Sequence, residues 1–452
     1  MKNKHMYKHI IFIITFSIVL FFYGWAQSYT SVTQPPPDTL PLHTYYVATT
    51  GNDSNPGTIG RPFKTWSKAW AAVVAGDIVY IRGGVYYPDP VTYCSVVMRY
   101  KSGMPGKYIR FFAYPGETPI LDCSNMIYKG SIPFLRAIDF KGDYWYFRGL
   151  EIRGVPQSVD PVTGHGYVSK GFVAQDSNFC IFENLNCHHN GGTGFLLGGN
   201  SNNNLILNSD FHHNYDPYSY ENDKLYFGGN ADGCEIAGIT KGCSNIISGC
   251  RFWWNSDDGL DLWRNEGNLI VQNCWSFWNG YQPGTFTSAG DGVGFKLGKT
   301  FEAGDSVPQR VIRNCVAYAN RRSGFDQNYA NVLMVFYNNT SYKNSFLGFR
   351  LSYYPSKHII KNNISYANYI VKSIDYQVSS ESDQTNNSWN GFLVTRADFL
   401  TIVPSGIDGA RMPDGKLPNI NFLKLAPTSG LVGKGVDVGL PFSGSTPNIG
   451  AY

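Results

Sequence analysis

The chain has 452 residues, of which 43% are hydrophobic and 15% are charged, with 49 glycines, 31 tyrosines and 29 phenylalanines. Its 37 basic and 33 acidic residues give a net charge of +4, which excludes a polyelectrolyte tail and predicts no nucleic-acid partner. The length allows one large core or two domains, and the many glycines and aromatic residues favour an all-β protein over a helical one.

The first 26 residues have the features of a secretory signal peptide. Lys2, Lys4 and Lys8 precede a mostly apolar run at 10–23, and Gly24 and Ala26 supply small residues at the two positions that specify cleavage. That run is too short and wrongly flanked for a membrane span, and no second run of spanning length follows. We expect cleavage near Ala26 and a monomer that is secreted to the periplasm or the medium. The nine cysteines allow disulfides there, but their spacing does not reveal a pairing.

The start of the mature chain differs from its middle. Residues 27–43, rich in proline between Pro35 and Pro41, are predicted to be a linker. From Tyr45 the pattern predicts a strand, a turn, a short amphipathic helix around residues 65–74 and another strand. The helix would cover the open end of a stack of coils, because solenoids need capped ends.

The middle of the chain carries an internal repeat of 24 residues. Short aromatic or histidine stretches end in asparagine 24 or 41 residues apart, the longer interval being one unit with an insertion of 17. These asparagines are Asn190, Asn214, Asn255, Asn279, Asn320, Asn344 and Asn368. A second asparagine lies six residues earlier in every unit but one, where Gly249 replaces it. This period is typical of a parallel β-helix, in which one asparagine per coil can bond to its neighbours above and below.

We therefore predict an all-β fold, a single right-handed parallel β-helix over residues 44–386 with an N-terminal helical cap. Residues 387–452, where the repeat fades, should form an irregular C-terminal tail that serves as a second cap.

The register of the repeat places residues that are distant in sequence in one column. The residues two positions after a recurring glycine are Leu196, Glu235, Asp261, Lys296, Asp326 and Arg350. Alternate residues of a strand point the same way, so these side chains should share one face. Ionisable groups avoid an apolar core, so the column should line an outer groove.

Four carboxylates should converge from two neighbouring coils. The stretch NSDDGLDLW, residues 255–263, contains Asp257, Asp258 and Asp261, and Asp232 stacks beside Asp258. Adjacent acids repel each other unless water screens them or a cation gathers them. Ligation by oxygen alone predicts Ca²⁺ rather than zinc, since the motif lacks histidine and cysteine. A solvated acidic turn is the alternative.

Lys296, in GDGVGFKLGK, is the candidate general base. It stands one coil beyond Asp261, which corresponds to roughly 5 Å between backbones. A neighbouring divalent cation would disfavour the protonated lysine and lower its pKa from about 10.4. A solvated surface lysine is the alternative reading.

Three motifs in this order, NADG, NSDDGLDLW and GVGFKLG, resemble the family 9 polysaccharide lyases, and the resemblance extends from GNDSNPGT to the terminal NIGAY. That family consists of parallel β-helix enzymes that act on pectic polymers. The resemblance implies that Asp232, Asp257, Asp258 and Asp261 bind one Ca²⁺ and that Lys296 is the base. It leaves open whether the substrate is polygalacturonate or rhamnogalacturonan I.

The implied reaction is β-elimination of a uronate polymer, in which Lys296 removes the proton on carbon 5 and the glycosidic oxygen leaves carbon 4. One alternative is a β-helix glycoside hydrolase that uses Asp257, Asp258 or Asp261 as acid and base. Another is a non-catalytic carbohydrate-binding solenoid with a platform of aromatic residues such as Trp253, Trp254 and Trp278.

The remaining charged members of the column are candidate substrate-binding residues. Arg350, two coils beyond Lys296, can grip a sugar carboxylate bidentately, and Glu235 and Asp326 stand on the same face. An ion pair between Arg350 and Asp326 on the preceding coil is the alternative.

Overall fold

The computed structural model describes residue 35 and residues 40–88, 93–127, 134–221, 224–300, 309–353 and 357–452. The predicted signal peptide and most of the predicted linker lie outside these residues. The chain divides into two units, Met1–Asp38 and Thr39–Tyr452, and every element named below belongs to the second. Within the described residues, no helix has the length and apolar character needed to cross a bilayer.

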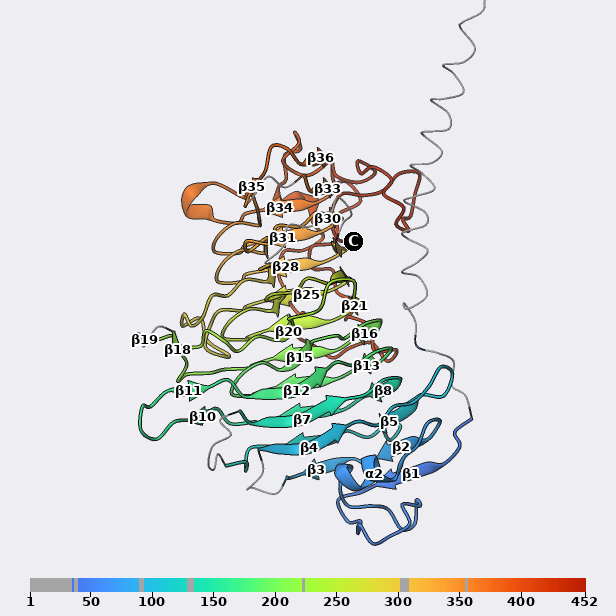
Figure 1. The fold of residues 1–452 in the computed structure, drawn as a ribbon. Helices are drawn as coiled ribbons and strands as arrows, with labels where there is room; N and C mark the ends of the chain where they lie inside the picture. Colours follow the sequence, from blue (N-terminus) through green and yellow to red (C-terminus); the bar gives the residue numbers. More distant parts are fainter. Residues whose placement is uncertain are drawn as a thin grey trace, which may run out of the picture. The chain divides into compact units, whose positions relative to one another are not determined.

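Three parallel sheets form the body of this unit, and their strands are stacked coil upon coil in chain order (Figure 1). Sheet 1 contains β1 (Thr44–Val47), β2 (Ile78–Ile81), β5 (Ile109–Ala113), β8 (Trp145–Arg148), β13 (Ile181–Glu183), β16 (Asn204–Leu207), β21 (Ser244–Ser248), β24 (Asn268–Gln272), β27 (Arg310–Arg313), β30 (Met334–Tyr337), β33 (Ile359–Lys361) and β36 (Asp383–Thr385).

Sheet 2 contains β4 (Cys94–Arg99), β7 (Arg136–Lys141), β12 (Lys170–Gln175), β15 (Phe195–Gly198), β20 (Cys234–Ala237), β23 (Leu260–Asp261), β26 (Phe295–Lys296), β29 (Phe325–Asp326), β32 (Phe349–Leu351) and β35 (Tyr376–Val378). Sheet 3 contains β3 (Gly84–Tyr86), β6 (Pro119–Asp122), β9 (Glu151–Arg153), β14 (Asn186–His188), β17 (Asp210–His212), β22 (Arg251–Trp253), β25 (Trp275–Phe277), β28 (Val316–Tyr318), β31 (Thr340–Tyr342) and β34 (Ile364–Tyr366). The predicted parallel β-helix is confirmed.

The predicted N-terminal helix is also confirmed. Helix α2 (Trp66–Ala72) begins after Thr65, whose hydroxyl accepts a hydrogen bond from the backbone N–H of Lys68. Trp66 is buried and packs edge-on against Phe111 of β5, so the helix closes the apolar interior at the first coils.

The asparagine ladder occupies one bend of the seven coils that carry the repeat, as the repeat predicts. The side-chain amide of each member donates to Oδ1 of the next member at 2.9–3.0 Å, from Asn190 through to Asn368. All seven side chains are buried, and a buried amide without a hydrogen-bond partner would destabilise the fold. The ladder gives each of these amides a partner.

The second asparagine column has a conformational cause. Asn184, Asn208, Asn273, Asn314, Asn338 and Asn362 have φ values between 48° and 60°, and Gly249 at the same place has φ 67°. Asparagine and glycine tolerate this left-handed conformation better than other residues. Gly249 therefore forms the same bend as the asparagines, although its residue type differs from theirs.

Two hairpins project from the coils as insertions: β10 (Ser158–Val159) with β11 (Gly166–Tyr167), and β18 (Tyr220–Glu221) with β19 (Lys224–Leu225). The second is anchored by Asp216, a buried residue whose carboxylate accepts from Ser256 Oγ at 3.1 Å and from the N–H of Asn230 at 3.1 Å. This insertion therefore connects the coil of Asp232 to that of Asp257.

The tail after residue 386 is irregular, as predicted; it contains the 3₁₀ turn η2 (Arg396–Asp398), and η1 (Ile370–Lys372) precedes it. Trp389 stacks on Tyr376 with ring centroids 4.7 Å apart and covers the last coils. Beyond this cap, the tail runs back along the outer face of sheet 3. There Phe422 packs on Tyr318, and Arg411 pairs with Asp210 of β17 at 2.6 Å.

All nine cysteines lie in the described part of the chain and are free. Cys250, Cys274 and Cys315 begin successive turns at one position of the repeat and are buried, where they pack as small apolar residues.

Candidate active site

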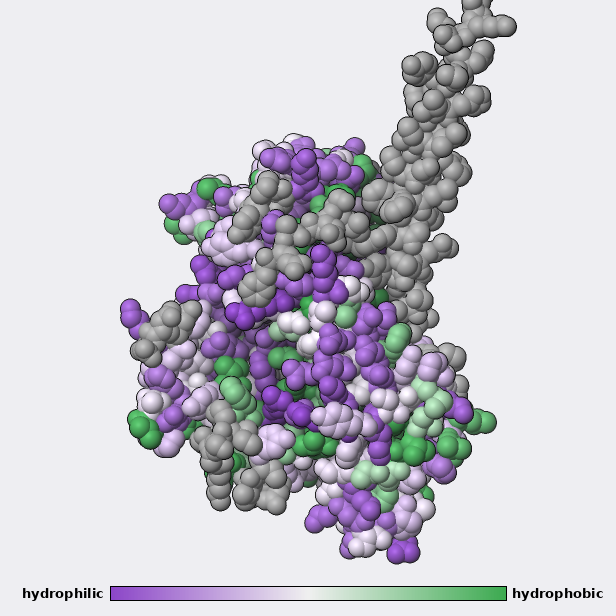
Figure 2. All heavy atoms as spheres, in the orientation of Figure 1, coloured by the Kyte–Doolittle hydropathy of each residue, from purple (hydrophilic) through white to green (hydrophobic). Residues whose placement is uncertain are grey.

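The predicted column lies on sheet 2, in register. Leu196 pairs with Glu235, Glu235 with Asp261, Asp261 with Lys296, Lys296 with Asp326, and Asp326 with Arg350. The alternate residues Leu260, Phe295 and Phe325 belong to the apolar core, so the charged side chains lie on the opposite face. Figure 2 shows hydrophilic residues, in purple, interspersed with hydrophobic ones, in green, over the face on which Figure 1 labels strands of sheet 2.

The column is more enclosed than an open groove. The exposed fractions of Asp261, Lys296 and Asp326 are only 6%, 9% and 3%. An inserted loop lies against the neighbouring acids, since the backbone N–H groups of Asp291 and Val293 donate to Oδ1 of Asp257 and of Asp258.

The predicted acidic residues come together as two overlapping groups. Carboxylate oxygens of Asp232, Asp258 and Asp261 lie within 4.8 Å of one another, and so do those of Asp257, Asp258 and Asp291. The backbone N–H of Asp258 donates to Asp232 Oδ1 at 3.2 Å, which joins the two coils. Asp258, common to both groups, is fully buried.

Asp291 is a member of the cluster that the register did not identify. It stands three residues before the recurring glycine rather than one, so no column contains it. The sequence feature that could have identified Asp291 is that it is the one acidic residue in GDGVGFKLGK, the motif that contains Lys296. Its carboxylate also pairs with Arg322 at 2.7 Å.

Lys296 lies among the carboxylates. Its Nζ is 2.7 Å from Asp258 Oδ2, 3.2 Å from Asp261 Oδ2 and 3.8 Å from Asp291 Oδ2. The alternative of a solvated surface lysine is therefore wrong. In this arrangement the ammonium group is the counter-ion of the cluster.

Burial and mutual repulsion dominate the electrostatics of the acids. Burial, followed by the charges of Asp261 and Asp257, raises the pKa of Asp232 well above its ordinary value. Burial raises the pKa of Asp257 strongly and that of Asp258 less, and it raises the pKa of Asp261 to about 7 despite the opposing charge of Lys296.

Lys296 experiences the reverse effect. Burial lowers its pKa, but the carboxylates of Asp258 and Asp261 outweigh burial and raise the pKa well above its ordinary value. With the acids uncompensated by another cation, the lysine is therefore held in its charged form.

These residues fit a hard divalent cation. The donors are carboxylate oxygens from neighbouring coils, and Oδ1 of Asp261 is buried with no hydrogen-bond partner. An unpartnered buried oxygen is costly unless a ligand reaches it, and Ca²⁺ takes oxygen donors in flexible geometry. The burial of all four acids also contradicts the alternative of a solvated acidic turn.

The predicted substrate-binding residues all have partners within the protein. Arg350 Nη1 lies 3.3 Å from Asp326 Oδ2, and its guanidinium stacks over Tyr353 at 4.5 Å. Glu235 Oε2 lies 2.5 Å from Nζ of Lys170, a cation that the register did not place near the column. The ion pair between Arg350 and Asp326 that the sequence allowed is therefore present.

The aromatic platform that the carbohydrate-binding alternative requires does not form as one surface. Trp253 is 5% exposed and is stacked between His212 and Phe277, while Trp254 and Trp278 are partly exposed. The buried ring cannot bind a sugar face.

Residues 45–387 match the family described as Pel9A-like, right handed beta helix region. The chain is 32% identical over 421 residues to pectate lyase L of Dickeya dadantii (strain 3937), covering 90% of each protein. Among solved structures, it is similar to pectate lyase Pel9A, with a TM-score of 0.73 and 31% identity over 91% of this chain and 96% of that one. A rhamnogalacturonan lyase gives a TM-score of 0.73 and 34% identity over 85% of this chain and 97% of that one.

Proposed function

Because this chain belongs to the Pel9A-like right-handed β-helix family and is a polysaccharide lyase, we propose that it cleaves galacturonate-containing pectic polymers by Ca²⁺-dependent β-elimination. The polymer is polygalacturonate or rhamnogalacturonan I, the substrates that the names of its structural neighbours suggest. Residues 44–386 form the catalytic β-helix in this proposal, and residues 387–452 belong to the same domain.

Asp232, Asp257, Asp258 and Asp261 are the proposed Ca²⁺ ligands. When bound, Ca²⁺ would neutralise the carboxylates that raise the pKa of Lys296 and would stabilise the negative charge that develops on the sugar carboxylate. Asp291 takes part as a neighbour of Asp257, whose Oδ1 accepts the Asp291 N–H at 2.5 Å.

Lys296 is the proposed general base. Its Nζ takes the proton from carbon 5, the C–H electron pair becomes the double bond between carbons 4 and 5, and the glycosidic oxygen leaves with its bonding pair. Water protonates that oxygen. The observation that carries this assignment is the position of Lys296 Nζ, 2.7 Å from Asp258 and 3.2 Å from Asp261.

Product analysis tests the reaction. Elimination leaves a conjugated double bond that absorbs ultraviolet light, whereas hydrolysis by an aspartate pair does not. We expect absorbing products from polygalacturonate or rhamnogalacturonan I, and their loss on adding EDTA, with recovery in excess Ca²⁺. Shortened chains without absorbance would establish the hydrolase alternative, and Ca²⁺-dependent binding without shortening would establish the binding solenoid.

We also propose that residues 1–26 are a signal peptide and that the mature protein is a secreted monomer. The basic and apolar segments before Ala26 support this proposal. N-terminal sequencing of the exported protein and its elution volume in size-exclusion chromatography test both parts.

A further inference from the structure

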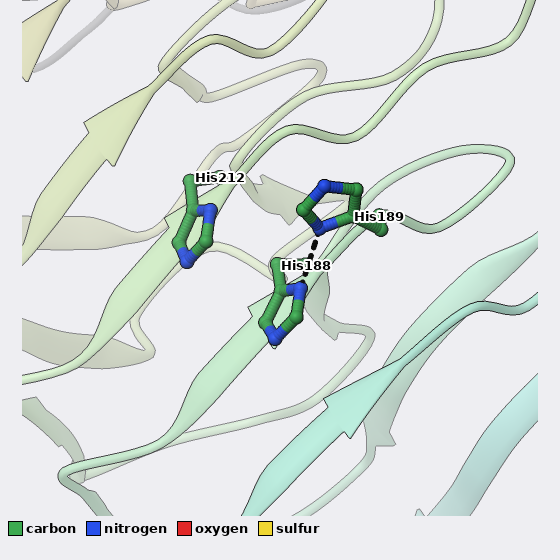
Figure 3. A group of neighbouring side chains, drawn as sticks. All are labelled: His188, His189 and His212. Carbon is green, nitrogen blue, oxygen red and sulfur yellow. Dashed lines mark hydrogen bonds between the residues drawn. The ribbon is translucent and has the colours of Figure 1, made fainter. Parts of the chain in front are cut away.

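Four histidines lie together on sheet 3, away from the acidic cluster on sheet 2. His188 ends β14 and His212 ends β17, and the two residues pair in register on neighbouring coils. His189 and His213 follow them with φ 54°, a bend that turns each second ring beside the first. Figure 3 shows His188 and His212 as parallel rings with His189 facing His188.

The ring nitrogens converge. His188 Nδ1 lies 2.6 Å from His189 Nδ1, and His212 Nδ1 lies 2.7 Å from His213 Nδ1. One ring nitrogen from each of His188, His189 and His212 lies within 4.8 Å of the other two. His188 and His212 stack with centroids 4.7 Å apart, and His213 offers a fourth ring beside them.

The outer nitrogens of two rings are held by oxygen acceptors. His188 Nε2 lies 3.2 Å from a carboxylate oxygen of Glu151, and His212 Nε2 lies 3.0 Å from Asn186 Oδ1. Both Nε2 atoms must therefore donate, which leaves an unshared electron pair on each Nδ1 of the neutral rings. A carboxylate that fixes the far nitrogen of a histidine is the usual support of a metal-binding imidazole.

We propose that His188, His189 and His212 bind one divalent transition metal ion of the class that prefers imidazole, with Zn²⁺ as the expected ion. Glu151 and Asn186 orient the ligands, and His213 stands beside them as a further nitrogen donor. Imidazole nitrogen suits zinc and copper, whereas the acidic cluster offers only oxygen.

Binding requires one small movement. Two nitrogens at about 2.0–2.1 Å from a tetrahedral zinc ion are about 3.3 Å apart, somewhat wider than the present 2.6 Å between His188 and His189. His189 is exposed, so its ring can turn outwards and carry its proton on the nitrogen that faces water.

Aromatic stacking alone is the competing explanation. His212 stacks on Trp253 at 4.0 Å, and the same column continues through Phe277 and Tyr318 under the C-terminal tail. Stacking accounts for flat rings at 188 and 212. Stacking also joins His189 to His213, whose ring centroids are 4.9 Å apart. It does not account for the acceptors on Nε2 or for the short Nδ1–Nδ1 distances within each coil.

The test uses the mature protein without a histidine tag, freed of metal and then held in excess Ca²⁺ to occupy oxygen sites. Calorimetric titration should show one Zn²⁺ bound with micromolar or tighter affinity. Bound Cu²⁺, used as a probe, should show nitrogen superhyperfine splitting in its electron paramagnetic resonance spectrum, which oxygen ligands cannot give.

His189→Phe retains a ring that can stack on His213 but removes the ligand, and it should weaken zinc binding at least about tenfold; Glu151→Gln should weaken it about 10–100-fold. His165→Ala, a histidine outside the cluster, is the matched control and should bind as the parent does. Melting temperatures without metal verify that each variant folds.

Three results would each overturn the site: no zinc binding below millimolar concentration, a copper spectrum with oxygen ligands only, or unchanged affinity in a folded His189→Phe protein. Lyase activity in Ca²⁺ should be the same in His189→Phe as in the parent, which separates this site from the proposed catalytic one.

Discussion

The asparagine ladder and the charged column pass through the same coils, yet they are built in opposite ways. Every ladder position in the repeat is asparagine, and each amide is satisfied by the next at 2.9–3.0 Å. The charged column changes residue at every coil, from Asp261 to Lys296, Asp326 and Arg350, although the backbones pair just as regularly.

The difference separates stability from chemistry. A neutral asparagine that hydrogen-bonds to the asparagines of the neighbouring coils stabilises every coil in the same way, wherever that coil lies in the stack. Buried like charges destabilise the fold unless an opposite charge or a cation compensates them, and here they are gathered around Lys296. Changes in the column should therefore alter turnover, and changes in the ladder should alter folding.

The largest effect is expected from Lys296→Ala. Removing a general base should reduce kcat by about 10²–10⁴-fold, and loss of the counter-ion leaves the acids to depend on Ca²⁺. The measurement is the rate of ultraviolet absorbance increase on polymer, with circular dichroism in Ca²⁺ to verify folding.

Lys343→Ala is the matched control, because Lys343 contacts the ring of Tyr342 and lies outside the column. Its activity should equal that of the parent. Substantial turnover by Lys296→Ala at alkaline pH would remove Lys296 from the role of base.

Asn279→Ala is expected to reduce stability while leaving kcat nearly unchanged. Asn279 donates to Asn320 at 2.9 Å and to the Phe252 carbonyl at 3.1 Å, and it accepts from Asn255 at 3.0 Å. Leaving buried partners unsatisfied costs about 1–3 kcal/mol each, so the free energy of unfolding should fall by at least about 3 kcal/mol.

Denaturant unfolding measures this loss, and kcat per folded molecule should stay near that of the parent. A stable variant with impaired turnover would show that the ladder, too, contributes to chemistry.

The repeat made the fold and the column predictable because a period fixes which residues stack. Lys296 and Asp261 are 35 residues apart in sequence, yet their pairing follows from counting. Asp291 and Lys170 could not be predicted from the period. Asp291 lies in an inserted loop and Lys170 is the first residue of β12, so neither occupies a position that recurs in the repeat.

The histidine cluster is visible in the sequence as HHN at two successive repeats, but this pattern predicts only the spacing of the coils. Its chemistry depends on Glu151 of an earlier coil, and on a bend that brings His189 beside His188. The position of the C-terminal tail could not be predicted either, because the repeat ends near residue 386 and gives no register for the residues that lie along sheet 3.

Asp216 differs from both groups, because it is a single buried acid with neither an asparagine ladder nor a cationic partner among the described residues. Burial raises its pKa from 3.8 to about 6, so the folded protein keeps a proton that the unfolded chain loses above about pH 4. The stability due to that proton is present at low pH and is lost as pH rises through 6.

Asp216→Asn cannot ionise, and its amide can donate to Ser256. Between about pH 4 and pH 7 the parent should therefore lose up to ~3 kcal/mol relative to this variant. Denaturant unfolding of both proteins at several pH values gives the difference, and parallel curves would show that Asp216 does not hold the proton.

Arg350→Ala is expected to have the smallest effect. It distinguishes two roles for Arg350, binding of a substrate carboxylate and neutralisation of Asp326. If Arg350 binds a sugar carboxylate, its loss should lower kcat/KM on polymer about tenfold, mainly through KM, because one charged contact is removed. If Arg350 only neutralises Asp326, kinetics should be normal and the variant should melt earlier. Asp326→Asn in the Arg350→Ala background should then restore the melting temperature, whereas it should leave a substrate-binding defect unrepaired.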